Sequence, residues 1–323
     1  RALPKLYPGS KYGQRMPIGL MSVVDNFKPK ELRDYYEKWY HPSNQGIIVV
    51  GDVDVDHTEA MIKKLFGSIK NPNNMAPVLD EPVPDNEQPI IIIDKDKEQS
   101  NSVVEVMFKH DAWPDSLKGK MDYIVANYVR NLALGMLNDR FVEVAQKPDC
   151  PFIGASAGDG SFIFAKTKNA FTISAAPKDI EKASIAIQAA LVEAYRASEF
   201  GFTQTEYDRA KANILSSLDK AFNSRDKRSS ASFADDYKGN FLSNEPIPAF
   251  EDYYQIMKEL IPMILTESSR SCCLRQIVIS LLSISITRNQ VMFILLVKRC
   301  SKLFTQPEMR SSLPMWTMSR TNL

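Results

Sequence analysis

The sequence predicts an α+β fold made of two homologous modules, each an antiparallel-rich sheet packed with helices, with the first module truncated. Residues 90–93 and 103–108 carry strand patterns, and residues 151–177 carry the alternation and glycine punctuation of antiparallel strands. Longer stretches carry apolar residues at helical spacing. Residues 26–36 (NFKPKELRDYY) and 244–254 (NEPIPAFEDYY) both run from Asn through Pro to Asp-Tyr-Tyr. They lie about one domain length apart, which indicates a duplicated module.

Composition narrows the class of protein. The chain has 323 residues, 44% of them hydrophobic, and a formal net charge of +1. It can therefore bury real cores, and it has no basic face for nucleic acid. No apolar run reaches the roughly 20 residues of a membrane span. The chain begins with Arg1 and shows no signal peptide, so we expect a piece of a longer protein.

The first elements follow from local patterns. Pro29 opens a predicted helix that ends before Pro42, and its apolar residues recur at helical spacing: Leu32, Tyr35, Tyr36 and Trp39. The β-branched run Ile47–Val50 lies between Gly46 and Gly51 and predicts a buried strand.

A second helix should follow this strand. Asp56 and Glu59 have the spacing of a capping box, and the helix that they open carries Ala60, Met61, Lys64, Leu65 and Phe66.

Residues 71–89 are rich in Pro, Asn and acids, without periodicity. We therefore assign residues 1–75 to the end of a first module, 76–89 to a linker, and 90–264 to a second module.

The second module should alternate strands and helices. Ile90–Ile93, Val103–Phe108 and two antiparallel strands within Pro151–Pro177 are the predicted strands. Three helices are predicted from 3.6-residue periodicity, over residues 121–136, 180–195 and 204–222.

The tail, residues 265–323, differs in composition from the rest. It has no glycine and no aspartate, yet it has ten serines and eight Lys or Arg. A disordered interaction tail is one explanation. We favour a shifted reading frame after about residue 264, which resequencing of the DNA would test. We expect residues 277–297 to be poorly ordered and prone to β-aggregation.

Candidate catalytic and metal-binding residues are few. His41, His57 and His110 are too far apart in sequence for one helix to present two imidazoles to zinc. We predict a surface role for His41 beside a helix C-terminus, and solvated positions for the other two histidines.

Other motifs also fail as sites. Asp52, Asp54 and Asp56 suggest a calcium loop, but His57 and Lys63 stand where glycine and glutamate are required. The glycine-rich stretch Gly154–Gly160 lacks a phosphate-binding motif, so we interpret it as turns between strands.

The four cysteines, Cys150, Cys272, Cys273 and Cys300, form no CxxC pair and indicate neither disulfides nor a thiolate metal site. Serines and aspartates are plentiful, but no plausible base histidine stands beside a GxSxG elbow, so we propose no hydrolase triad. We assign no catalytic, cofactor-binding or metal-binding residue to this chain.

Residues 7–56 resemble the end of the first module of pitrilysin or insulinase family zinc peptidases, especially large Bacteroidetes members. The resemblance rests on RMPIGL (15–20), LRDYYEKWY (32–40) and VVGD (49–52), although His41-Pro42-Ser43 replaces the usual Arg-Pro-Asp. Residues 90–264 resemble the second module, including IGASAG (153–158) and FTQTEYDRAKANIL (202–215).

This resemblance implies a fold like that of mitochondrial processing peptidase, with modules that enclose a chamber for unfolded peptides. In the family, zinc is held by an inverted HxxEH motif and a downstream Glu, which would precede Arg1. Zinc is therefore expected in the parent protein and not on this chain. The implied partners are a peptide substrate and the remaining modules or a homologous subunit, in the periplasm or cell envelope. The alternatives are a non-catalytic partner subunit and, less favoured, an independent peptide-binding module.

Overall fold

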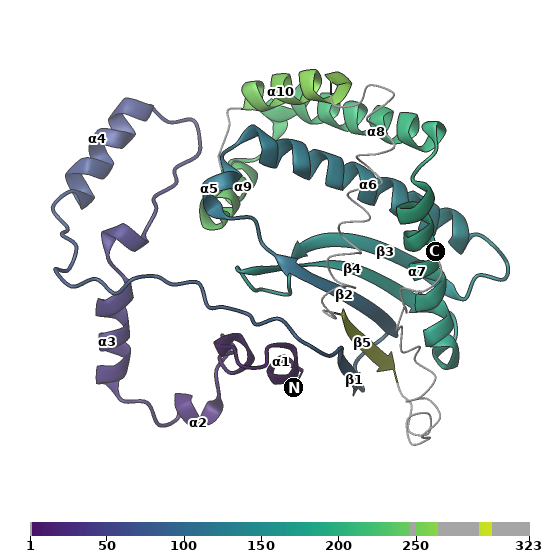
Figure 1. Ribbon diagram of the computed structural model, residues 1–323. Helices are drawn as coiled ribbons and strands as arrows, with labels where there is room; N and C mark the ends of the chain where they lie inside the picture. Colours follow the sequence, from purple (N-terminus) through teal and green to yellow (C-terminus); the bar gives the residue numbers. More distant parts are fainter. Residues whose placement is uncertain (1, 246–249, 264–290, 299–323) are drawn as a thin grey trace.

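Five strands form one sheet in the order β1-β5-β2-β4-β3 (Figure 1). The structure is a computed structural model that describes residues 2–245, 250–263 and 291–298. β5 pairs parallel with β1 and antiparallel with β2, and β4 pairs antiparallel with β2 and β3. The strands are β1 Ile90–Asp96, β2 Val103–Asp111, β3 Phe152–Ser161, β4 Lys168–Pro177 and β5 Val291–Lys298.

Helices cover one face of this sheet in two layers. α6 packs against β3, α7 packs against β4 and β2, and α8 lies on α6 with α10 beside it (Figure 1). The helices of this region are α5 Asp115–Lys118, α6 Met121–Ala145, α7 Ala183–Phe200, α8 Gln204–Asn223, α9 Ser230–Ser243 and α10 Phe250–Met263. The α+β prediction and the three predicted helices are confirmed.

The main core lies between the sheet and α6 and α7. Residues at every second position of β2 and β4 point to the helices, as the alternation predicts. Its fully buried side chains include Leu132, Met136, Phe141, Phe152 and Ile173. Burial of each such side chain contributes about 1.5–3 kcal/mol.

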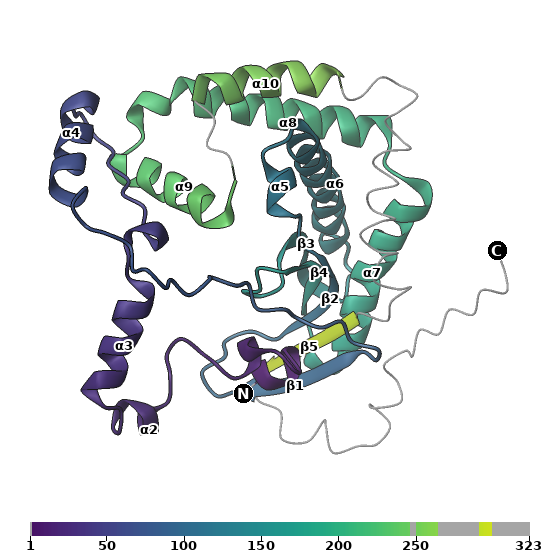
Figure 2. The same ribbon diagram turned by 60° about the vertical axis from the view of Figure 1, so that its left-hand side comes forward.

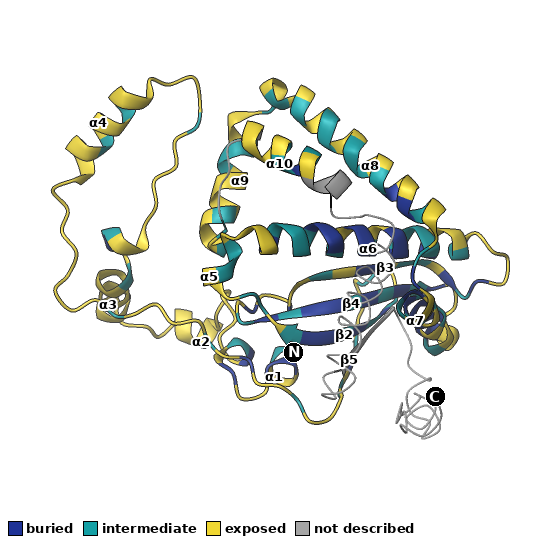
Figure 3. Cartoon of the chain, turned by 45° about the horizontal axis from the view of Figure 1, so that its top comes forward, coloured by how far each residue is buried: buried dark blue, intermediate teal, exposed yellow. Residues whose placement is uncertain are grey.

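The chain before β1 forms an extended arm beside this unit (Figure 2). Its helices are α1 Leu3–Leu6, α2 Met21–Val24, α3 Pro29–Trp39 and α4 Val55–Phe66. α1 packs against β1, whereas α2, α3 and α4 have no buried residue and are almost wholly exposed in Figure 3.

Two predictions for the arm are wrong in detail. Ile47–Val50 forms no strand, and Ile47 is 52% exposed. A strand needs a neighbour for its backbone hydrogen bonds, and none of the described strands lies beside this run. The following helix is capped by Asp54, whose side chain accepts from the His57 N–H, and not by Asp56.

The glycine-rich stretch Gly154–Gly160 lies inside β3, so the prediction of turns there is wrong. β3 is an edge strand, and a Cβ at Gly154, Gly158 or Gly160 would meet no atom within 4 Å. Crowding therefore does not require glycine at these positions. The register of β3 is given by its pairing with β4.

The predictions for residues 265–290 and 299–323 lie outside the described residues. Residues 291–297, predicted to be poorly ordered, instead belong to β5, which lies between β1 and β2. No helix in the described part of the chain is long and apolar enough to cross a membrane.

Candidate functional site

His41 is buried, at 4% exposure, so the predicted surface role is wrong. The Asn44 amide donates to Nε2 of His41 (3.2 Å) and to the Trp39 carbonyl (3.1 Å). Nδ1 therefore carries the proton and donates to Ser43 Oγ at 2.7 Å. Ser43 Oγ in turn donates to Met75 Sδ, so these hydrogen bonds tie residues 39–44 to residue 75. The polar groups around His41 are close in sequence, but their spacing alone does not predict that they contact the imidazole.

His110 is also less solvated than predicted. Its side chain is 14% exposed, and Nε2 lies 2.7 Å from Oδ1 of the fully buried Asp159. Arg130 approaches the other oxygen of this carboxylate at 2.7 Å. The three groups join β2, β3 and α6 in a network of polar contacts. His57 is exposed in the first turn of α4, as predicted.

The described residues do not fit a zinc site. No group of three or more His, Cys, Asp or Glu side chains converges to hold a metal ion in this part of the chain. Both ring nitrogens of His41 are engaged by Ser43 and Asn44, and His110 is held by Asp159. Cys150 is buried and free, while the other three cysteines lie outside the described residues.

Tyr7 fixes the arm to the β3–β4 hairpin. It is 1% exposed, and its hydroxyl donates to the Phe162 carbonyl (2.6 Å) and accepts from the Phe164 N–H (3.3 Å). Ile163 between them has φ of 58°, a left-handed conformation that is costly for a β-branched residue. Burial raises the pKa of the Tyr7 phenol. One hydroxyl thus holds both peptide groups beside a strained residue.

Residues 80–85 form a strap that crosses the ends of β2 and β4. Nζ of the fully buried Lys109 donates to the Pro84 carbonyl at 3.1 Å. Lys168 lies 2.6 Å from Asp85 and 2.5 Å from Asp111. Burial, with repulsion from Lys168, lowers the pKa of Lys109 to about 8, although Asp85 opposes this shift. The strap, which lies shortly before β1 in the sequence, is therefore held in place by two lysines.

The sheet face opposite α6 and α7 is polar and partly open. Glu105, Thr172 and Ser174 are half-buried there, and Ser156 and Gly158 of β3 are exposed. Ser174 Oγ donates to Glu105 at 2.8 Å. Small and polar side chains leave this face able to border a water-filled space.

The outer edge of β3 is partly closed by α6. Asn138 donates to the Ala157 carbonyl (3.0 Å) and accepts from the Ala157 N–H (2.7 Å). One side-chain amide thereby takes the place of a neighbouring strand at this position.

Comparison with known families decides the relationship of the chain. Residues 26–214, more than half of the chain, match the family described as the peptidase M16 inactive domain. The chain belongs to the peptidase M16 family.

Two M16 relatives match over most of the chain. The zinc protease PQQL-like protein of Arabidopsis thaliana is 27% identical over 257 residues, which are 79% of this chain and 23% of that protein. The probable zinc protease PqqL of Escherichia coli is 26% identical over 270 residues, 82% of this chain and 28% of that protein. The chain thus spans about a quarter of the length of these relatives.

Solved structures confirm the M16 fold. The first half of the periplasmic protease PqqL from Escherichia coli has a TM-score of 0.77 at 21% identity, covering 92% of this chain and 60% of that one. A mutant of the ferredoxin protease FusC, solved in complex with Arabidopsis ferredoxin, has a TM-score of 0.70 at 16% identity, covering 99% of this chain and 35% of that one.

Several residues that organise this M16 domain were missed in the sequence. Tyr7 lies in a Pro- and Gly-rich stretch without periodicity, and Asn138 is a polar residue inside a helix. Lys109 could have been flagged, because it directly follows the largely apolar predicted strand 103–108. Nothing in the sequence indicates which backbone groups these side chains meet.

Proposed function

We propose that this chain is part of a zinc-dependent metalloendopeptidase that degrades unfolded peptides in an enclosed chamber. In this proposal it supplies chamber wall and contacts between modules, and the zinc site lies elsewhere in the parent protein. The observation that carries the proposal is the match to the inactive domain of a family whose relatives here are named zinc proteases.

Within this proposal, residues 1–75 complete a first module, 76–89 link it to the second module at 90–264, and 265–323 are an out-of-frame tail. The open polar face of the sheet is the chamber wall. The strap at residues 80–85 favours this arrangement, because a docked connection fixes the orientation of what precedes it.

The exposed apolar side chains of the arm support a missing counterpart. Ile18 is 85% exposed, and α3 and α4 present further large apolar residues to solvent: Leu32, Tyr35, Tyr36, Met61 and Leu65. Monomers rarely leave so many large apolar side chains together in water. We infer that the rest of a first module, in the same chain or in a homologous subunit, covers them.

Periplasmic location and a peptide substrate belong to the same proposal. The first is supported by the solved relative, which is described as a periplasmic protease. The alternative function is a non-catalytic partner subunit, which the description of the matched domain as inactive favours. The upstream coding sequence separates the two, because a peptidase requires HxxEH and a downstream Glu there.

Cleavage of an unstructured peptide tests the proposal. The full chain is incubated with zinc and a fluorogenic casein-like peptide, with and without chelator. We expect no chelator-sensitive turnover from the chain alone, and turnover when the upstream sequence with an intact HxxEH is restored. Zinc-dependent cleavage by the chain alone would contradict the assignment of the zinc site.

A further inference from the structure

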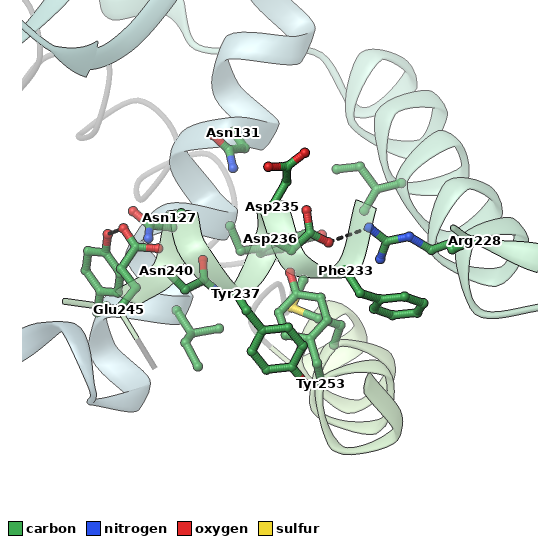
Figure 4. Close-up of a pocket in the computed structure, with 16 residues that line it drawn as sticks. Asn127, Asn131, Arg228, Phe233, Asp235, Asp236, Tyr237, Asn240, Glu245 and Tyr253 are labelled. Atoms are coloured by element: carbon green, nitrogen blue, oxygen red, sulfur yellow. Dashed lines mark hydrogen bonds and ion pairs between the residues drawn. The ribbon is translucent and has the colours of Figure 1, made fainter. Parts of the chain in front are cut away.

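A cavity of about 840 Å³ opens between α6, α8, α9 and α10 (Figure 4). It lies on the side of α6 away from the sheet, and thus apart from the polar face assigned to the chamber wall (Figure 1). Its lining combines tyrosines, asparagines and acids with apolar side chains, among them Ile124, Ile214 and Met257. Nothing in the proposed function uses it.

The charges of the lining are unbalanced. The cavity has three carboxylates and one guanidinium, that of Arg228, which binds Asp236 at 2.5 Å. Asp235 is paired with Lys238 at the exposed surface. Glu245 accepts a hydrogen bond from the neutral Tyr123 hydroxyl at 2.8 Å, and no cation of the described residues lies within ion-pair distance of it. Among the described residues, Glu245 therefore has no direct ion-pair partner.

Aromatic rings form much of the wall. Phe233 already receives the Arg228 guanidinium, whose central carbon is 4.5 Å from the ring centroid. Tyr237 and Tyr253 line the same space and are 38% and 40% exposed. Guanidinium groups stack on aromatic faces and are weakly hydrated, so such walls suit them.

Two kinds of polar group lack partners. Tyr128 lines the cavity and is 4% exposed, yet its hydroxyl has no hydrogen-bond partner among the described residues. The side-chain amides of Asn131 and Asn240 line it as well, and no hydrogen bond is found for either within the described part of the chain. Asn138 shows what such an amide can do, since it binds both backbone groups of Ala157.

We propose that this cavity binds an arginine side chain of another polypeptide, with Glu245 as its charge partner and Tyr237 and Tyr253 as stacking walls. The volume exceeds that of one side chain and leaves room for the flanking backbone, for which Asn131 and Asn240 supply donors and acceptors. A polypeptide therefore fits better than a free amine.

Calorimetric titration of the full chain tests this site. The probe is acetyl-Gly-Ser-Arg-Ser-Gly-amide, and the comparison peptide carries citrulline, which has the shape of arginine without its charge. We expect saturable binding of the arginine peptide and binding about tenfold weaker, or more, for citrulline, since a charged hydrogen bond is lost. No binding of the arginine peptide at millimolar concentration would overturn the proposal, as would equal affinity for both peptides.

Variants locate the site. Glu245→Gln keeps an acceptor for Tyr123 and should weaken binding of the arginine peptide about tenfold. Glu259→Gln is the matched control, because this exposed acid lies on α10 outside the cavity; its affinity should be that of the wild type. Equal melting temperatures of the two variants show that both are folded. Wild-type affinity in Glu245→Gln would refute the assignment of Glu245.

Discussion

Arg140 of α6 and Glu206 of α8 form a two-point ion pair, with Nε 2.5 Å and Nη2 2.9 Å from the two carboxylate oxygens. The same carboxylate accepts the Thr203 N–H and thereby closes the N-terminus of α8. Arg140 also donates to the Gly201 carbonyl. One acid thus fixes both the start of a helix and its position on the neighbouring helix.

Glu206→Gln should destabilise the fold by about 2–3 kcal/mol at pH 7. Burial acts to raise the pKa of Glu206, but Arg140 and Thr203 outweigh it and lower the pKa from 4.5 to about 2. The folded state therefore binds its proton less readily than the unfolded state does. The contribution of the acid is complete above pH 4.5 and is lost as the pH falls towards 2. Urea unfolding at several pH values measures it.

Glu251→Gln is the control for Glu206, because Glu251 is 62% exposed and pairs with Arg225 at the surface. It should change the free energy of unfolding by less than about 1 kcal/mol. Equal effects of the two substitutions, or a Glu206 effect that persists unchanged at pH 2, would contradict this account.

Tyr7→Phe should cost about 1–2 kcal/mol, because the Phe162 carbonyl and the Phe164 N–H both lose a partner in a buried place. Tyr12→Phe removes a hydroxyl that accepts an exposed, 3.4 Å bond from the Lys166 N–H and should cost about 0.5 kcal/mol or less. Thermal unfolding compares the two. A smaller loss for Tyr7→Phe than for Tyr12→Phe would show that the strained Ile163 turn stands without Tyr7.

Lys109→Met should stabilise the chain at pH 7 by about 2 kcal/mol, after allowance for the lost bond to the Pro84 carbonyl. The pKa of Lys109 falls from 10.5 to about 8 in the fold, so the unfolded chain binds the proton more readily between these values. Wild-type stability should therefore fall as the pH drops from about 10.5 to 8, whereas that of the variant should stay flatter.

Denaturant unfolding across this pH range measures the Lys109 effect. Lys166→Met is the control, since Lys166 is 59% exposed and its ion pair with Asp80 is long, at 3.8 Å. It should leave the pH dependence of stability unchanged. A destabilised Lys109→Met at pH 7 would mean that the strap depends on the lysine more than burial of its charge costs.

Asn138→Ala should cost about 1–3 kcal/mol and increase self-association, because it frees the N–H and carbonyl of Ala157 at a sheet edge. Asn131→Ala on the same helix removes an exposed amide and should change stability by about 0.5 kcal/mol or less. Sedimentation at increasing protein concentration measures the association. A monomeric Asn138→Ala with wild-type stability would contradict the edge-closing role.

Much of residues 90–223 was predictable because most elements there carry their own period. The strands at residues 90, 103 and 152–177 and the helix predicted over 121–136, which extends to Ala145, follow from strand patterns and from helical spacing, whereas α9 and α10 were not predicted. Ile47–Val50 has equally strong strand propensity and is not a strand, because propensity supplies no neighbour. A strand pattern therefore predicts a strand correctly only where the fold supplies a neighbouring strand for its backbone hydrogen bonds.

The contacts that organise the site region were beyond local patterns. Asn138 and Ala157 are 19 residues apart, Tyr7 and Phe162 are 155 apart, and Lys109 and Pro84 are 25 apart. His41 was misjudged for a different reason, since the turn that follows it brings Ser43 and Asn44 onto its two ring nitrogens. A hydrogen bond from a side chain to a distant backbone group cannot be predicted from composition or from residue spacing.

The position of β5 between β1 and β2 bears on whether a change of reading frame disturbs the sheet. β5 joins β1 and β2 through main-chain groups, which every residue except proline provides in full. An eight-residue apolar stretch such as VMFILLVK can meet that requirement whichever reading frame encoded it. If residues 265–323 are out of frame as proposed, the strand beside β1 has a sequence on which selection never acted. Restoring the frame would then replace the residues of this strand and keep its main-chain pairing with β1 and β2.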